Sequence, residues 1–237
     1  MKKSKLYMSS IALLCVMCGV LLPSALVAQD AEKKELSPEA VAQKMQSFYD
    51  TTADFQASFK QVYTDLAAGE SKKSYGKVYI KKPGKMRWDY YKESKGKQKP
   101  EKAMVSDGKV FWVYEYEFKQ VFKECLASSK LPTSVTFLMG EGNLLESFDV
   151  SFEKSSSEAK PVIKLVPKKP TSQYKELHFV VDGKTFQVLK TTIFDPYGNT
   201  NEIVFSKVKF DQNLPDKGFS FKPPKDARLL NPQKECP

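Results

Sequence analysis

Residues 76–116, GKVYIKKPGKMRWDYYKESKGKQKPEKAMVSDGKVFWVYEY, decide the fold of this chain. Val78 and Ile80 alternate with polar residues ahead of a Pro-Gly pair, and Met86 and Trp88 alternate in the same way after it. Successive residues of a strand point to opposite faces of a sheet, so these four side chains share one apolar face. The stretch therefore predicts consecutive antiparallel strands joined by short turns.

Turn signals repeat along the rest of the chain. The sequence VSDGKVFWVY at 105–114 has an echo in VVDGKTFQVL at 180–189, and in both an Asp-Gly pair between apolar residues predicts a hairpin. A lysine-rich segment with a proline, residues 92–102, separates the first two hairpins and predicts a loop. We count about ten or eleven strands without alternating helices, which favours one large antiparallel sheet over a parallel one.

Two segments predict helices. Ser37-Pro38-Glu39 has the residues of a helix start, and apolar residues follow at helical spacing up to Tyr49. Residues 115–147 are apolar and interrupted by glycines, which predicts one or two short helices. Both segments can pack simply on the sheet or lie over a cavity as a movable cover, and the residues alone leave these alternatives open.

The composition is that of a folded and basic protein. Hydrophobic residues make up 41% of the 237 residues and charged residues 28%, which allows a sizeable core. The formal charge is +10, and the lysines are spread along the whole chain. This spread is typical of a solvated surface and does not indicate a nucleic-acid site, although a positive surface also favours approach to anionic membranes.

The N-terminus has the pattern of a secretory signal peptide. Lysines at positions 2, 3 and 5 precede an apolar run at residues 11–22, which is short for a membrane span. We expect cleavage near Ala28, which leaves residues 29–237 as a single exported domain. Neither Cys15 nor Cys18 follows a small residue, so a soluble protein is favoured over a lipid-anchored one.

Two cysteines, Cys125 and Cys236, remain after the leader. An even pair in an oxidising compartment favours one disulfide, which ties the C-terminus to the end of a strand. Two separate thiols are the alternative.

The residues give little support for catalysis. His178 is the single histidine, and its place between apolar residues of a predicted strand favours a solvent-facing position over a catalytic role. The sequence has no nucleophile elbow, phosphate-binding loop or dinucleotide fingerprint, and no set of His and Cys residues spaced for a metal. We therefore expect neither an enzyme nor a protein with a metal or cofactor.

Several segments together resemble the LolA family of periplasmic carriers of bacterial lipoproteins. The resemblance implies an unclosed antiparallel β-barrel whose short helices form a lid over a hydrophobic cavity. It also implies a periplasmic protein that takes acylated lipoproteins from an inner-membrane ABC transporter and delivers them to an outer-membrane acceptor, and we expect a monomer. The matching segments are FQASFKQ (55–61), GKVYIKKPGKMRWDY (76–90), VSDGKVFWVY (105–114) and FSFKPPK (219–225).

The resemblance and the strand alternation together predict the residues of such a site. Family members have a basic residue, usually arginine, before a strand-ending proline, and it holds the lid closed in the empty carrier. This position falls on Lys82, which keeps the charge but lacks the planar fork of arginine. The residues expected to line the cavity are Val78, Ile80, Met86, Trp88, Val110 and Trp112 on the sheet, and Phe137, Leu138, Met139 and Leu144 on the lid.

A covered apolar cavity suits such a cargo. Each acyl methylene exposed to water costs about 0.8 kcal/mol, so a chain of about ten methylenes costs on the order of 8 kcal/mol. Three other functions stay open at this point: a fold of the same kind that binds another lipid or glycolipid, an envelope-stress sensor domain, and a secreted hydrolase.

Overall fold

The computed structural model describes residues 36–94, 97–129, 133–140, 142–230 and 236. The predicted leader, residues 1–28, and its cleavage site lie outside this part of the chain. The described residues all belong to one compact unit, Glu35–Pro237. None of its described helices is long and apolar enough to cross a membrane.

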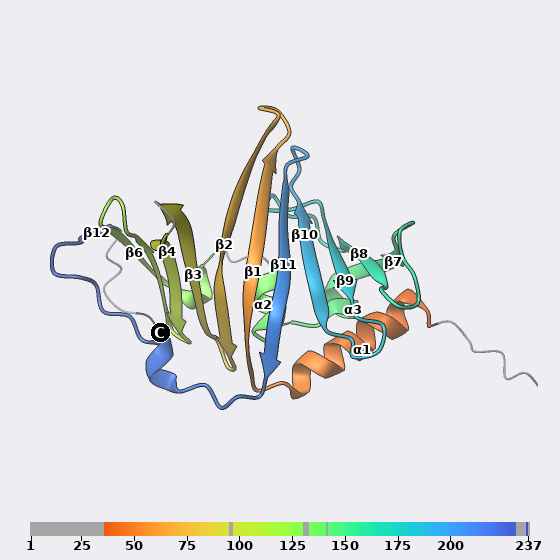
Figure 1. Ribbon diagram of the computed structural model, residues 1–237. Helices are drawn as coiled ribbons and strands as arrows, with labels where there is room; N and C mark the ends of the chain where they lie inside the picture. Colours follow the sequence, from red (N-terminus) through yellow and green to blue (C-terminus); the bar gives the residue numbers. More distant parts are fainter. Residues whose placement is uncertain (1–35, 95–96, 130–132, 141, 231–235, 237) are drawn as a thin grey trace, which may run out of the picture. The chain divides into compact units, whose positions relative to one another are not determined.

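A single sheet of twelve strands dominates the described residues (Figure 1). Most of the strands are joined by short turns into hairpins, as the repeated turn signals predicted. The strands are β1 (Asp54–Asp65), β2 (Glu70–Lys81), β3 (Lys85–Ser94), β4 (Lys97–Asp107), β5 (Val110–Glu115), β6 (Gln120–Cys125), β7 (Phe148–Phe152), β8 (Val162–Pro167), β9 (Glu176–Val181), β10 (Val188–Phe194), β11 (Thr200–Phe210) and β12 (Arg228–Leu230).

The sheet is curved and unclosed. Its order from edge to edge is β12-β6-β5-β4-β3-β2-β1-β11-β10-β9-β8-β7, so the edge strands β12 and β7 do not pair with each other. All neighbouring strands are antiparallel except β12, which lies parallel to β6. The predicted fold class, a mainly β protein with an unclosed antiparallel sheet and few helices, is confirmed, with twelve strands in place of ten or eleven.

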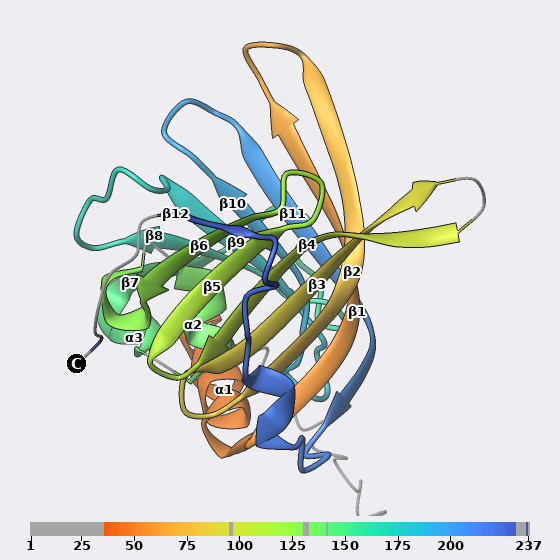
Figure 2. The same cartoon turned by 90° about the vertical axis from the view of Figure 1, so that its left-hand side faces the viewer.

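Three α-helices lie on the concave side of the sheet, which curls around them (Figure 2). The first begins as predicted, because Ser37 Oγ accepts a hydrogen bond from Ala40 N at 3.2 Å and Pro38 occupies the first turn. Val41, Ala42, Met45 and Tyr49 form its buried face. The helices are α1 (Pro38–Thr51), α2 (Thr133–Leu138) and α3 (Leu144–Ser147), and two 3-10 turns are η1 (Leu126–Ser128) and η2 (Asp216–Phe219).

The lysine-rich segment 92–102 is not the loop that its composition predicted. β3 continues to Ser94 and β4 starts at Lys97, with an irregularity in the pairing between Tyr90 and Tyr91. Cross-strand pairing therefore overrides the weak strand propensity of lysine in a long projecting hairpin. The β4–β5 turn is displaced by one residue from the predicted Asp107-Gly108 pair. β4 ends at Asp107 and β5 begins at Val110, so residues 108–109 form the turn.

Both faces of the strands β3 to β6 are covered. On the outer face, the ring centroid of Phe221 lies 5.7 Å from that of Trp112 and 5.9 Å from that of Tyr114. Phe219 is buried in the same C-terminal segment. We call residues 214–230 the C-terminal strap, because they cross the outer face and end in β12 beside β6. The strap leads to Cys236, which forms a disulfide with Cys125 at the end of β6.

Candidate functional site

The concave face of the sheet is apolar and buried. Val78, Ile80, Met86 and Trp88 are at most 3% exposed and belong to one hydrophobic cluster. The ring of Trp88 lies 5.0 Å from that of Phe59 on β1, in an edge-to-face contact. Four of the predicted sheet residues are thus brought together on this face.

A glycine makes room for this aromatic contact. At Gly76 on β2, a Cβ atom would lie 2.8 Å from the ring of Phe59 and 2.0 Å from the backbone oxygen of Asp89. A larger residue at position 76 would therefore displace either the ring or the neighbouring strand.

The helical side of the cluster comes from the segment between β6 and β7. Phe137, Leu138, Met139 and Leu144 are at most 3% exposed and belong to the same cluster. We call α2 and α3 the lid, because their apolar side chains lie directly on the concave face. The ring of Phe137 is 5.1 Å from that of Tyr49 on α1 and 6.0 Å from that of Phe179 on β9.

The prediction that Val110 and Trp112 lie on this concave face is wrong. Cross-strand partners share a face, and Trp88 is opposite Met104, which is opposite Val113. Trp112 is opposite Val105 and belongs to the other row, where the C-terminal strap covers it. Val110 has the same parity as Trp112 and also faces outward, and both are only half-buried.

Lys82 lies where α1, the lid and the end of β2 meet. Its Nζ donates a hydrogen bond to the backbone oxygen of Tyr49 in the last turn of α1. Its side chain also runs beside Gly140 at the end of α2, where a Cβ atom would lie 2.4 Å from Lys82 Cε. Burial lowers the pKa of Lys82, and the carboxylates of Asp50 and Asp211 oppose that effect.

Two aspartates stabilise the backbone near Lys82. Asp54 is 3% exposed, and its carboxylate accepts hydrogen bonds from Gln212 N at 2.8 Å and Leu214 N at 3.0 Å. The carboxylate of Asp211 accepts a hydrogen bond from Ala53 N at 2.9 Å. These contacts join the start of β1 to the end of β11, beside the C-terminal end of α1.

A polar contact between α1 and the lid region was not predicted from the sequence. Gln46 Oε1 accepts a hydrogen bond from Leu144 N at 3.1 Å, and its Nε2 donates to Gly142 O at 3.4 Å. Asp50 orients the amide by accepting from the same Nε2 at 2.8 Å. Lys168, just after β8, joins the sheet to the lid, because its Nζ donates to Leu145 O at 2.7 Å.

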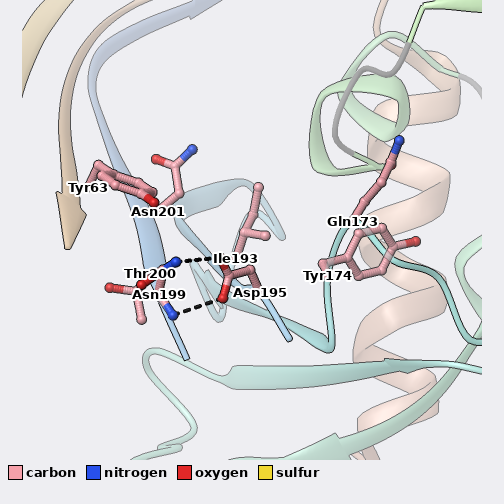
Figure 3. Close-up of a pocket in the computed structure, with 8 residues that line it drawn as sticks. All are labelled: Tyr63, Gln173, Tyr174, Ile193, Asp195, Asn199, Thr200 and Asn201. Carbon is pink, nitrogen blue, oxygen red and sulfur yellow. Dashed lines mark hydrogen bonds between the residues drawn. The ribbon is translucent and has the colours of Figure 1, made fainter. Parts of the chain in front are cut away.

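An open pocket of about 350 Å³ lies at the other end of the concave side (Figure 3). Tyr63 and Asn201 stand on one side of it, with Tyr174 across from them, and Ile193 belongs to the hydrophobic cluster. At the edge of the pocket, the carboxylate of Asp195 accepts two hydrogen bonds from Asn199. One comes from the backbone N at 2.9 Å and the other from the side-chain Nδ2 at 2.7 Å. The remaining residues of the lining are Gln173, Asn199 and Thr200.

Comparison with known proteins assigns this chain to a family. Residues 50–222 match the family described as "Outer membrane lipoprotein carrier protein LolA". The chain belongs to the LolA family. The match includes every strand except β12, and both helices of the lid.

Curated relatives agree with this assignment, and a solved structure shares the fold. An outer-membrane lipoprotein carrier protein of Methylococcus capsulatus is 28% identical over 194 residues, covering 82% of this chain and 88% of the relative. A protein of the same description from Legionella pneumophila is 27% identical over 197 residues, covering 83% and 90%. An uncharacterized conserved protein of Thermus thermophilus has a similar fold, with a TM-score of 0.50 at 14% identity over 81% of this chain and 97% of that one.

His178 lies on the outer face of β9, where its contacts are with neighbouring side chains of the sheet. Its Nε2 lies 3.0 Å from Glu176 Oε1, and its ring packs 4.6 Å from that of Phe194. Glu176 also pairs with Lys164 at 3.1 Å, and these contacts lower the pKa of the Glu176 carboxyl group. Among the described residues, no three His, Cys, Asp or Glu side chains gather to hold a metal ion.

Proposed function

We propose that this LolA-family protein carries lipoproteins through the periplasm by sheltering their acyl chains against its concave face. The observation that carries the proposal is a continuous apolar cluster shared by the sheet and the lid. Its members include Trp88 and Met86 on one side and Phe137 and Met139 on the other. In the closed arrangement these apolar side chains bury one another. When the lid moves, an acyl chain takes the place of the lid residues against the sheet.

The way the lid is attached supports this movement. Lys82, Gln46 and Lys168 each bond to a backbone oxygen or amide of α1 or the lid region, and no covalent link holds the described lid residues down. Such hydrogen bonds are worth roughly 1 kcal/mol each, and somewhat more when charged. Opening the lid therefore costs part of the acyl-binding energy, which lowers the net affinity and permits transfer to a tighter acceptor.

The route and compartment are part of the same proposal. We propose cleavage of the leader near Ala28, a monomer in the periplasm, receipt of the cargo from an inner-membrane ABC transporter, and delivery to an outer-membrane acceptor. The disulfide between Cys125 and Cys236 suits an oxidising compartment.

The test is release of a radiolabelled lipoprotein from spheroplasts incubated with the purified protein. We expect the label in the supernatant as a one-to-one complex. Label that stays with the membranes at every concentration of the protein contradicts the carrier function. If mass spectrometry then finds another lipid bound to the purified protein, the alternative of a different lipid cargo replaces it.

A pair of variants separates the concave face from the outer face. Met104→Glu places a charge on the half-buried concave side of β4, whereas Val110→Glu places the same charge on the half-buried outer side of β5. We expect the first to abolish release and the second to leave it near the level of the unchanged protein. Circular dichroism of both variants checks that each still folds.

A further inference from the structure

The direction of the strands gathers several turns at one end of the sheet. Thr64 near the end of β1 pairs with Thr200 at the start of β11, so the β1–β2 turn lies beside the β10–β11 turn. β5 runs in the same direction as β1, which places the β5–β6 turn at this end too. We call this end the rim. It lies uppermost in Figures 1 and 2, and the β1–β2 hairpin projects furthest from it.

The most exposed large hydrophobic side chains of the described residues all stand on the rim. Tyr197 is 84% exposed, Phe118 is 66% exposed and Leu66 is 64% exposed. Each occupies a different turn: β10–β11, β5–β6 and β1–β2 respectively. Other large hydrophobic residues of the described chain are at most 42% exposed. Single exposed residues are ordinary on protein surfaces, but three at the tips of three hairpins on one end form a pattern.

Two of the three tips, Leu66 and Tyr197, are held in place by hydrogen bonds. Leu66 N donates to Asn199 Oδ1 at 2.9 Å, which ties the β1–β2 turn to the β10–β11 turn. The carboxylate of Asp195 accepts from Tyr197 N at 2.8 Å and from Asn199 N at 2.9 Å. The side chain of Leu66 lies against Gly198, where a Cβ atom would come within 2.7 Å. Because the turns are already ordered, a partner that binds them immobilises few additional groups.

Exposed lysines lie on the strands and connections that reach the rim. Lys72 and Lys73 follow Leu66 on β2, and Lys72 also shares a shallow pocket with Phe118. Acidic groups also lie in this region, and several are paired. Glu101 pairs with Lys72 at 3.6 Å, Glu117 with Lys92 and Asp226 with Lys119, while Asp195 binds backbone amides. Further exposed lysines on the strands and connections that reach this end are Lys97, Lys99, Lys119, Lys169 and Lys175.

We propose that the rim is a docking surface for an anionic phospholipid bilayer. Leucine, phenylalanine and tyrosine at the tips enter the headgroup region, and the surrounding lysines face the anionic headgroups. This interaction goes beyond carriage of a cargo, because it requires no lipoprotein. It also brings the pocket beside Tyr63 and Tyr174, which opens at the same end, to the membrane surface.

Vesicle flotation tests the proposal directly. The protein is purified in the form that its host processes, and mass spectrometry verifies that the apolar leader is absent. Vesicles of phosphatidylethanolamine with phosphatidylglycerol are compared with vesicles of phosphatidylcholine alone. We expect the protein to float with the anionic vesicles, to float far less with the neutral ones, and to be released by high salt.

The decisive variant replaces the three tips together, Leu66→Ser with Phe118→Ser and Tyr197→Ser. We expect its affinity for anionic vesicles to fall roughly tenfold or more, because most of the inserted apolar surface is lost. The matched control is Phe152→Ser with Val204→Ser, which removes two exposed hydrophobic residues away from the rim and leaves vesicle binding unchanged. All five positions are exposed, so the variants are expected to fold.

Two results would overturn the proposal: absence of the unchanged protein from the anionic vesicle fraction, or equal flotation of the unchanged protein and the triple variant. Binding of a fluorescent acyl probe is measured in parallel and is expected to persist in the triple variant. For the unchanged protein, failure of lipoprotein release with intact vesicle binding would reject the carrier function alone. Absence of vesicle binding by the unchanged protein with intact release would reject the docking surface alone.

Discussion

The ammonium group of Lys82, at the end of β2, donates a hydrogen bond to the backbone oxygen of Tyr49 in the last turn of α1. The same lysine side chain packs beside Gly140 at the end of α2. One residue of the sheet thus contacts both α1 and the lid. Cations are favoured at the C-terminal end of a helix, where backbone oxygens lack partners within the helix.

Replacement of Lys82 by alanine tests its role as a latch. We expect the affinity for a fluorescent acyl probe to rise several-fold, because the hydrogen bond to α1 and the packing beside Gly140 at the end of α2 are both lost. The half-exposed setting of the ammonium group keeps this effect modest. Lys77→Ala, at an exposed position of the same strand, is the control and is expected to bind like the unchanged protein. Unchanged or weaker probe binding by Lys82→Ala would show that the lysine is no latch.

Gln46 is expected to act as a second, separate latch. Gln46→Leu removes the hydrogen bonds to Leu144 N and Gly142 O, so the acyl probe should bind a few-fold more tightly. Gln43→Leu changes an exposed glutamine of α1 in the same way and should have no effect. Hydrogen exchange at the amide of Leu144 provides the direct readout. Equal exchange rates in the two variants would refute the role of Gln46.

The disulfide between Cys125 and Cys236 is expected to stabilise the fold through the C-terminal strap. The cysteines are 111 residues apart, and a cross-link over so long a loop typically contributes about 2–4 kcal/mol. Urea unfolding of the double variant Cys125→Ser with Cys236→Ser should show a loss of this size, with a red shift of Trp112 emission as the strap loosens. Coincident unfolding curves for the variant and the unchanged protein would contradict this expectation.

Acid should weaken the attachment of the strap at Asp216. Hydrogen bonds from Lys81 and Lys85 lower the pKa of this carboxyl group from 3.8 to about 2. A depressed folded-state pKa contributes stability that is complete above 3.8 and is lost as the pH falls through about 2. The difference in unfolding free energy between the unchanged protein and Asp216→Asn should therefore shrink across this window. A difference that already disappears above pH 3.8 would contradict the ion pairs.

The face of Trp88 could be predicted from the sequence, whereas that of Trp112 could not. Around Trp88, apolar residues alternate with Arg87 and Asp89, so only one face is apolar. Around Trp112, the sequence VFWVY is apolar at every position, and alternation does not say which side faces the helices. The outer side is buried by Phe221, which lies more than a hundred residues further along the chain.

Polar contacts at a distance were also beyond the reach of the sequence. Lys82 was identified through its place before Pro83 in a resemblance to a family. Gln46 has no such signal, because a glutamine beside the apolar face of a helix usually points to solvent. Its partners Gly142 and Leu144 lie 96 and 98 residues further along the chain, so only the tertiary fold brings them to it. The hydrophobic tips of the rim are likewise brought to one end by the strand order. In the sequence, each tip is a single apolar residue in an ordinary turn.

A photoreactive acyl chain shows whether the concave face shelters lipid. A lipoprotein with a diazirine in its acyl chain is released by the protein, irradiated and analysed by mass spectrometry of the cross-linked peptides. We expect cross-links to the concave face and the lid, including peptides with Met104, Phe205 and Phe137. Cross-links confined to Val110, Trp112 and the C-terminal strap would contradict a lipid shelter on the concave face.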